Sequence, residues 1–274
     1  MGPLGITGTE AGLGPPPGRP REPRISIVVP ALNEARNLRE VLPTLPEVHE
    51  VILVDGGSVD RTVETARETL PGIITLSQRR TGKGNALAAG FARVTGDVVV
   101  MFDADGSADA EEIPRFVAAL LDGADFAKGS RFRPGGGSVD ITRARRLGNR
   151  FLHTWMNVAF ETRFTDLCYG YNAFWADLIP VLDLPDHELV TPAGASMLWG
   201  DGFEIETLIT CRVATAGLSI AEVPSVERAR LHGESNLRAV TDGWRVLRTL
   251  RTERARVRRA RALDEALLES RESP

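Results

Sequence analysis

Asp97-Val98-Val99-Val100-Met101-Phe102, followed by Asp103-Ala104-Asp105, is the stretch of this 274-residue chain that decides its fold. A short run of β-branched and other apolar residues is typical of a strand that is buried on both faces. The run ends in two carboxylates one residue apart. It therefore predicts a buried strand whose carboxyl end presents polar side chains to a ligand.

Two earlier runs repeat this arrangement. Ile25–Pro30 precedes Ala31-Leu32-Asn33-Glu34, and Val51–Val54 precedes Asp55-Gly56-Gly57. Stretches with helical periodicity separate the apolar runs. We expect further strands over 73–76 and 125–128, and helices over 33–45 (with Pro43 favouring an earlier end), 58–70, 85–94, 111–121, 144–160 and 203–216. This alternation predicts an α/β fold with a mostly parallel central sheet flanked by helices.

The composition along the chain suggests three parts. Residues 1–23 are rich in Gly and Pro and are predicted to be a disordered tail. Residues 24–237 form the predicted catalytic domain, and residues 238–274 a basic helical extension. In the extension, Trp244, Leu247, Leu250 and Val257 recur at roughly helical spacing among arginines. The extension either lies on an anionic membrane or packs on the core through Trp244 and Leu247, and the second interpretation is favoured.

Charge and hydropathy exclude some classes of partner. The formal net charge of −4 offers no general attraction to nucleic acid. The sequence has no apolar run near the ~20 residues that cross a bilayer, and no signal-peptide pattern. We therefore expect a cytoplasmic protein, with peripheral contact at the inner face of the cell membrane left open. Cys168 and Cys211 are predicted to be buried free thiols.

Polar residues at the strand ends predict a ligand site. Ligands of open α/β sheets bind at the carboxyl ends of the strands. Asp103 and Asp105 offer the hard oxygen ligands that Mg²⁺ or Mn²⁺ prefers. Gly82-Lys83-Gly84 precedes a helix, so its N–H groups and Lys83 either meet a diphosphate or form an ordinary turn. Glu204 and Glu206 are two apart, and we expect one to line the pocket and the other to be solvated.

These motifs resemble the family 2 glycosyltransferases, and among them the dolichol-phosphate mannosyltransferase and polyprenyl-phosphate glycosyltransferase group. The resemblance implies a GT-A-type nucleotide-sugar-binding fold and metal-dependent, inverting transfer of a hexose from a nucleoside-diphosphate sugar of the GDP-mannose or UDP-glucose type. The matching segments are VVPALNE (28–34), VDGGSVDRT (54–62), GKGNAL (82–87), FDADG (102–106), KGSRF (128–132), TDLCYGYNAF (165–174), GFEIETLITCRVATAGLSIAEVPS (202–225) and RLHGESN (230–236).

The resemblance also implies roles for single residues. Glu34 and Asp55 would read the nucleoside, Asp103 and Asp105 would hold the metal, and Arg131 would meet the acceptor phosphate or the donor diphosphate. The residues expected to bind the donor are Pro30, Leu32, Glu34, Asp55, Lys83, Asp103 and Ala104. Asp166 is the candidate acid/base on the acceptor side, with the capping of a turn before Cys168 as the alternative.

The acceptor stays open at this point. Gly56, Ser107 and Asn236 stand where many relatives carry an acidic residue, glutamine and lysine, respectively. A polyprenyl phosphate at a membrane surface is one candidate acceptor, and a small phosphorylated metabolite or a glycan is the other. A nucleotidyltransferase is the alternative from a different class, but no glycine- and arginine-rich phosphate loop follows the first strand.

Overall fold

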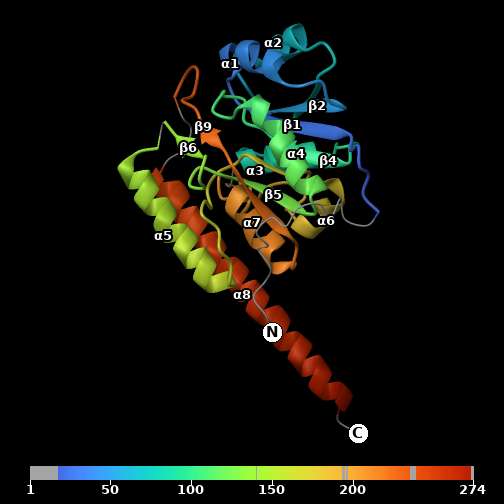
Figure 1. Cartoon of the computed structure of the whole chain (residues 1–274), viewed down its shortest axis with the longest axis vertical. Helices are drawn as coiled ribbons and strands as arrows, with labels where there is room; N and C mark the ends of the chain where they lie inside the picture. The colour runs from blue at the N-terminus through green and yellow to red at the C-terminus, as the bar shows by residue number, and fades with distance from the viewer. Residues whose placement is uncertain (1–17, 140, 193–194, 196, 235–238, 273–274) are drawn as a thin grey trace.

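A seven-stranded sheet forms the centre of the protein, in the order β3-β2-β1-β4-β7-β5-β8 (Figure 1). The computed structural model describes residues 18–272 except 140, 193–194, 196 and 235–238. The strands are β1 (Ile25–Ala31), β2 (Glu50–Asp55), β3 (Ile74–Ser77), β4 (Val98–Met101), β5 (Phe126–Ser130), β7 (Asn172–Trp175) and β8 (Ile220–Pro224). A second, two-stranded sheet pairs β6 (Gly137–Ser138) with β9 (Val226–Glu227).

The sheet is mostly parallel, as the sequence predicts. Val28 of β1 pairs with Ile52 of β2 on one side and Met101 of β4 on the other, both in parallel register. Only β7 is antiparallel to its neighbours β4 and β5 among the strands of this sheet in the described residues. Neither β7 (Asn172-Ala173-Phe174-Trp175) nor β8 (Ile220-Ala221-Glu222-Val223-Pro224) is predicted from the sequence, because neither is a continuous run of β-branched residues.

The helices agree with the sequence in type and differ from it at their ends. They are α1 (Ala35–Val41), α2 (Thr62–Thr69), α3 (Lys83–Phe91), α4 (Ile113–Leu121), α5 (Arg143–Phe160), α6 (Ile179–Leu182), α7 (Ile205–Thr215) and α8 (Ala239–Glu272). The first helix ends at Val41, and a 3₁₀ turn over Leu42–Thr44 follows with Pro43 in its first positions. Proline lacks the N–H that would continue the α-helical ladder, which explains the early end.

The core lies on both faces of the sheet. Ile27, Val28 and Val29 follow one another in β1, so their side chains alternate between faces, and all three are fully buried. Helix α3 reaches the sheet closely at Gly90, where a Cβ would lie 2.4 Å from Cγ1 of Val28. The buried core on both faces of the sheet therefore holds the strand ends in place, as a binding site requires.

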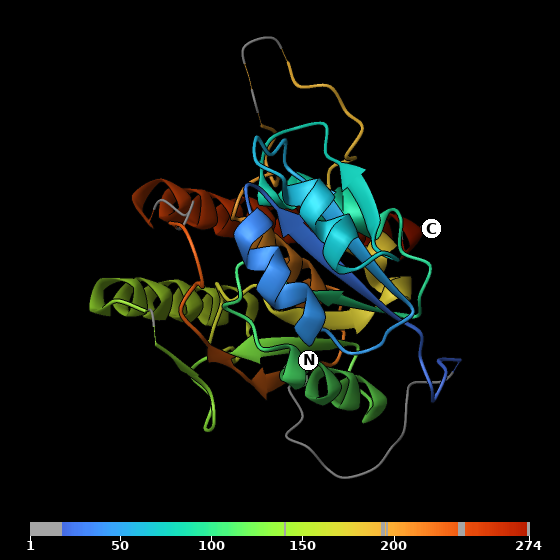
Figure 2. The same ribbon diagram turned by 90° about the horizontal axis from the view of Figure 1, so that it is seen from above.

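Helices α5 and α8 lie side by side, and α8 projects well beyond the body (Figures 1 and 2). Leu250 and Thr249 of α8 are fully buried, and Trp199 donates a hydrogen bond to the Thr249 hydroxyl at 3.1 Å. The expectation that Trp244 packs on the core is wrong, because its side chain is 62% exposed. The first turns of α8 thus belong to the folded body, through different residues from those predicted.

Two smaller predictions meet the structure at the edges of the fold. Most of the predicted tail, residues 1–17, lies outside the described residues, but Arg19 pairs with Asp125 at 2.6 Å and Asp177 at 2.9 Å. Cys211 is buried as expected, whereas Cys168 is exposed. No helix of the described residues is both long and apolar enough to cross a membrane.

Candidate active site

The predicted donor site lies where the strand order reverses. Strands β2 and β3 extend the sheet to one side of β1, and β4 begins the other side. Such a switch point leaves a crevice beyond the carboxyl ends of the strands, where α/β proteins bind ligands. Glu34 follows β1, Asp55 ends β2, and Asp103 and Asp105 follow β4.

Two loops at this edge are bonded to each other. Asn33 has a left-handed backbone (φ 58°), and its side-chain oxygen accepts from the N–H of Val59 at 2.8 Å. The hydroxyl of Ser58 accepts from the N–H of Asn33 at 2.8 Å. The helix predicted over 33–45 therefore starts later, at Ala35, because Asn33 joins the loop after β1 to the loop after β2. Asparagine tolerates this backbone conformation better than most residues.

Asp55 lies at the base of the second loop. Its carboxylate accepts from the N–H of Gly57 at 3.1 Å and from that of Ser58 at 3.2 Å. The side chain is mostly buried. These contacts fix the carboxylate at the end of β2, where it shapes the loop.

Lys83 joins two carboxylates at this edge of the sheet. Its Nζ lies 2.7 Å from Oδ1 of Asp103 and 2.8 Å from Oε1 of Glu206. Burial alone would lower the pKa of Lys83, but the two carboxylates outweigh burial and raise it. Burial raises the pKa of Glu206, against the opposing effect of Lys83. The lysine therefore stays protonated at neutral pH and provides a fixed positive charge beside Asp103.

Arg230 joins a second pair of carboxylates. One guanidinium nitrogen pairs with Oε1 of Glu34, and another lies 3.1 Å from Oδ2 of Asp105. The backbone N–H of Leu231 donates to the carbonyl of Asp105 at 3.0 Å. Burial raises the pKa of Glu34, although Arg230 and Asn37 partly offset it. The chain after β9 thus lies over the end of β4 and neutralises the carboxylates there.

The glycines around Lys83 are needed for packing. The N–H of Gly84 donates to the carbonyl of Asp201 at 2.6 Å, and a Cβ at Gly84 would lie 1.9 Å from the Gly200 carbonyl oxygen. The N–H of Gly84 is therefore already hydrogen-bonded within the protein. This favours an ordinary turn at Gly82-Lys83-Gly84 over a loop that binds a diphosphate. Gly170 also lies close to this lysine, since a Cβ at Gly170 would approach the Nζ of Lys83 to 2.9 Å.

Glu204 and Glu206 are both buried, so the expectation that one of them is solvated is wrong. Glu204 stands just before α7 and accepts from the N–H of Gly200 at 3.0 Å. Glu206 faces Lys83. Every residue of α7 from Ile205 to Ala214 is buried, so this helix has no solvated face on which Glu206 could lie.

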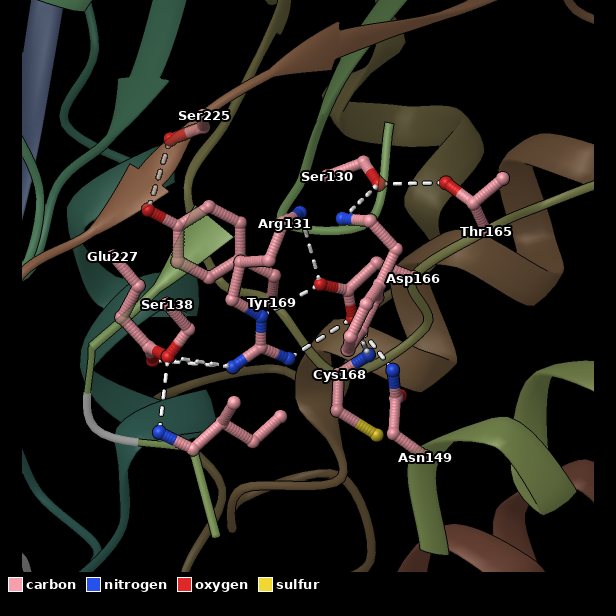
Figure 3. Close-up of polar contacts among 12 residues, drawn as sticks. Ser130, Arg131, Ser138, Asn149, Thr165, Asp166, Cys168, Tyr169, Ser225 and Glu227 are labelled. Carbon is pink, nitrogen blue, oxygen red and sulfur yellow. Dashed lines mark hydrogen bonds and ion pairs between the residues drawn. The ribbon is translucent and has the colours of Figure 1, made fainter. Parts of the chain in front are cut away.

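Arg131 and Asp166 form a buried ion pair (Figure 3). Nε of Arg131 lies 2.6 Å from Oδ2 of Asp166, and its Nη1 lies 3.0 Å from Oε2 of Glu227. Asn149 of α5 donates to Oδ1 of Asp166 at 3.1 Å. The ring of Tyr169 lies 4.9 Å from the guanidinium carbon of Arg131. Both side chains predicted to act on the acceptor are thus engaged with other parts of the protein.

Burial alone would raise the pKa of Asp166, but the hydrogen bonds and charge of Arg131 keep it below its ordinary value. Asp166 has no exposed surface. These contacts are typical of a residue that positions Arg131. The acid/base role of Asp166 and the phosphate-binding role of Arg131 stay predictions.

The remaining predicted donor residues lie at the same edge. Pro30 is within β1, and Leu32 just after it is partly exposed. Ala104 is buried between the two aspartates. The backbone N–H of Ser107 donates to Oδ1 of Asp105 at 3.0 Å, a contact that does not depend on the serine side chain. Asn236 lies outside the described residues.

The sequence matches glycosyl transferase family 2 over residues 26–179. The chain belongs to this family. Glycosyltransferase AglJ of Haloferax volcanii is 29% identical over 231 residues, which cover 82% of this chain and 70% of AglJ. Polyprenol monophosphomannose synthase of Mycolicibacterium smegmatis is 30% identical over 239 residues, which cover 83% of this chain and 85% of the synthase. The predicted family is confirmed, and so is glycosyltransferase activity.

The fold of this glycosyltransferase is also found in solved structures. Glucosyl-3-phosphoglycerate synthase of Mycobacterium tuberculosis, solved with Mn²⁺, UDP and glucosyl-3-phosphoglycerate, superposes with a TM-score of 0.64 at 23% identity. The match covers 85% of this chain and 80% of the synthase. The predicted GT-A-type fold is confirmed.

Asp103 and Asp105 fit a metal ion that arrives with its nucleotide. Their side chains are 33% and 23% exposed, and both offer hard oxygens. The described residues contain no group of three or more His, Cys, Asp or Glu placed to hold a metal. Mg²⁺ is usually held by one or two carboxylates together with substrate phosphates, so a pair is sufficient.

Proposed function

We propose that this glycosyltransferase transfers a hexose, with inversion, from a nucleoside-diphosphate sugar of the GDP-mannose or UDP-glucose type to a phosphate-bearing acceptor. The observation that carries the proposal is the meeting of Glu34, Asp55, Asp103 and Asp105 at the switch point of the sheet. Carboxylates there can accept from ribose hydroxyls and a base N–H. The Mn²⁺ and UDP bound by the structurally similar synthase support a divalent ion in this role.

Each residue of the site then has a task. Glu34 and Asp55 bind the nucleoside, and Asp103 and Asp105 would hold Mg²⁺ or Mn²⁺ on the diphosphate. When bound, the ion would act as a Lewis acid that offsets the negative charge of the departing nucleotide. Lys83, kept protonated by Asp103 and Glu206, adds a positive charge at the same place. Arg230, which contacts Glu34 and Asp105, adds a second positive charge beside the residues that would hold the metal.

The acceptor we propose is a polyprenyl phosphate. The name of the mycobacterial relative, a polyprenol monophosphomannose synthase, supports this class. A phosphate is already anionic and needs no general base, which agrees with an Asp166 that is buried and paired with Arg131. Such an enzyme would work as a peripheral protein at the inner face of the cell membrane. A small phosphorylated acceptor is the second candidate, supported by the phosphoglycerate compound in the structurally similar synthase.

A transfer assay tests the proposal. Donors with uridine and guanosine nucleotides are paired with a short-chain polyprenyl phosphate or with phosphoglycerate, in Mn²⁺ or in chelator. We expect transfer with one donor, to the polyprenyl phosphate, and only with metal. Asp105→Ala should lower kcat by roughly 10²-fold or more, since Lewis-acid stabilisation is worth several kcal/mol.

The matched control is Asp122→Ala, which removes a carboxylate at the end of α4 and should keep full activity. Transfer to phosphoglycerate alone would replace the lipid acceptor with the soluble one. Full activity in chelator would contradict the metal role.

A further inference from the structure

Helix α5 carries three large apolar side chains on its outer face. Leu147, Phe151 and Val158 are 69%, 61% and 76% exposed. Their spacing of four and seven residues places them in one stripe along the helix. Single exposed apolar residues are ordinary on a protein surface, but a stripe of them marks an interaction site.

The same helix is strongly basic. Its 18 residues contain four arginines and no aspartate or glutamate. Arg143, Arg146 and Arg150 are exposed; by helical spacing Arg143 and Arg150 lie beside the apolar stripe, and Arg146 lies farther round the helix on the same side. A helix with an apolar face and arginines around it is typical of segments that lie in the interface of a membrane.

The inner face of α5 is fully used by the fold. Met156 and Phe160 are buried in the core, and Asn149 is buried where it donates to Asp166. Packing within the domain therefore fixes which face points outward. The apolar stripe cannot turn inward without breaking these contacts.

The neighbouring helix α8 continues the basic surface. Trp244 near its start is 62% exposed, and Arg248 and Arg251 in the next turns are exposed as well. The guanidinium carbon of Arg254 lies 5.9 Å from the ring of Trp155, which ties α8 to α5. Tryptophan is enriched at membrane interfaces, where it has both apolar and polar surroundings.

We propose that the outer face of α5, with Trp244 of α8, docks on an anionic lipid surface. Charge decides between this occupant and a second copy of the chain. A second copy would present the same acid-free helix to the arginines, whereas anionic lipid headgroups attract each basic group near the surface. The proposal rests on the lipid-phosphate acceptor proposed above, and it names the surface that would bring the enzyme to that acceptor.

The position of α5 connects docking with the acceptor side of the site. Asn149 lies on the inner face of this helix and hydrogen-bonds Asp166, which holds Arg131. A lipid surface against the outer face would therefore lie one helix diameter from this ion pair. A lipid-linked phosphate would reach the Arg131 region without leaving the membrane.

Co-sedimentation with vesicles tests the proposal. The probes are phosphatidylcholine vesicles with and without phosphatidylglycerol, at low and high salt. We expect the wild-type protein to bind only the anionic vesicles, and to be released by high salt. Leu147→Glu/Phe151→Glu should weaken this binding about tenfold or more, because two large apolar side chains leave the interface. The matched control is Leu189→Glu/Val190→Glu, which adds the same charge at two exposed apolar residues of the loop between α6 and α7. This variant should bind vesicles as the wild type does.

A second variant tests the proposal in case the first variant does not fold. Arg146→Gln/Arg150→Gln keeps the apolar stripe and should also lose binding to anionic vesicles. Wild-type binding by both α5 variants, or no binding of the native protein at low salt, would overturn the proposal. So would a dimer in sedimentation velocity that only the α5 variants disrupt, since that outcome assigns the face to a second copy.

The proposed function is tested separately in the same variants. Leu147 and Phe151 lie outside the donor site, so nucleotide binding and transfer to a detergent-dispersed polyprenyl phosphate should be unchanged. Loss of vesicle binding with transfer retained supports the docking surface. Absence of transfer in the wild-type protein, with vesicle binding intact, would instead count against the proposed function.

Discussion

The environment of Asp166 differs from what its expected role as an acid/base requires. It is fully buried, and it accepts from Arg131 and Asn149. A general base must reach the proton that it removes, whereas a buried partner of an arginine holds that arginine in place. We therefore treat Asp166 as a positioning residue.

Replacing Asp166 should lower stability. Asp166→Asn leaves Arg131 in a buried position with one acidic partner fewer, and breaking a buried ion pair costs about 3 kcal/mol. Because folding lowers the pKa of Asp166, its contribution is present above the unfolded pKa of about 4 and is lost as pH falls through the folded value. Denaturant titrations should show the largest difference from wild type at neutral pH and a smaller one below pH ~4. A variant of unchanged stability but inactive at every pH would instead favour the acid/base role.

Asp55 should act on donor binding. Asp55→Ala removes the acceptor of two loop N–H groups and the proposed partner of the nucleoside. We expect the KM for the donor to rise roughly tenfold or more, with a smaller change in kcat, because an unmatched polar partner is costly in a buried site. Asp55→Asn keeps an oxygen that can accept from the loop N–H groups, so it separates the effect on the loop from the effect on nucleoside binding. An unchanged KM in both variants would exclude the nucleoside role.

The sequence could identify the carboxylates of the site but not their partners. Glu34 and Asp105 stand out because each follows a buried strand. Arg230, which pairs with both, is 196 residues from Glu34. Such a pairing depends on how the chain after β9 folds back, and no local pattern encodes it. The same holds for the contact between Arg131 and Asp166.

At the scale of elements, the parallel strands were predictable and the antiparallel one was not. β1, β2 and β4 are continuous apolar runs because both faces are buried. β7 has only four residues, and its burial comes from the strands on either side. Helix ends were predicted incorrectly where tertiary contacts determine them. The first helix starts after Asn33, because Asn33 is hydrogen-bonded to the adjacent loop.

The start of α3 tests whether its glycines serve packing. In Gly84→Ala the new Cβ would lie 1.9 Å from the carbonyl oxygen of Gly200, so the helix must move away from that segment. We expect a loss of about 1–3 kcal/mol, as for other overpacked positions. The control is Gly148→Ala in α5, where a Cβ meets nothing within 4 Å and alanine favours the helix. A calorimetric midpoint for Gly84→Ala at or above that of wild type would contradict the packing role.

Helix α8 should contribute to the stability of the domain. Leu250 is fully buried beside Val246, so Leu250→Ala should cost about 2–5 kcal/mol. The exposed Trp244 provides the control, since Trp244→Ala should change the unfolding free energy by less than about 0.5 kcal/mol. Equal effects of the two substitutions would mean that the two residues are equally buried in solution.

At the scale of the whole molecule, the sheet brings the donor site and the acceptor side together. The carboxylates proposed to bind the nucleotide lie at the switch point beside β1, while Arg131 directly follows β5 and Asp166 lies in the loop before β7. Helix α5 lies at the edge of the molecule (Figure 2), and the side chains of its apolar stripe are exposed. Donor, acceptor cluster and proposed membrane face thus follow one another across the protein.

Metal-dependent nucleotide binding by Asp103 and Asp105 is the central claim, and thermal unfolding with UDP or GDP tests it most directly. One nucleotide at about 100 times its Kd should raise the midpoint of the wild-type protein by roughly 5–10 °C with Mn²⁺. This rise should disappear in chelator and in Asp105→Ala but persist in Asp122→Ala. An equal rise in chelator, or in Asp105→Ala, would contradict the central claim.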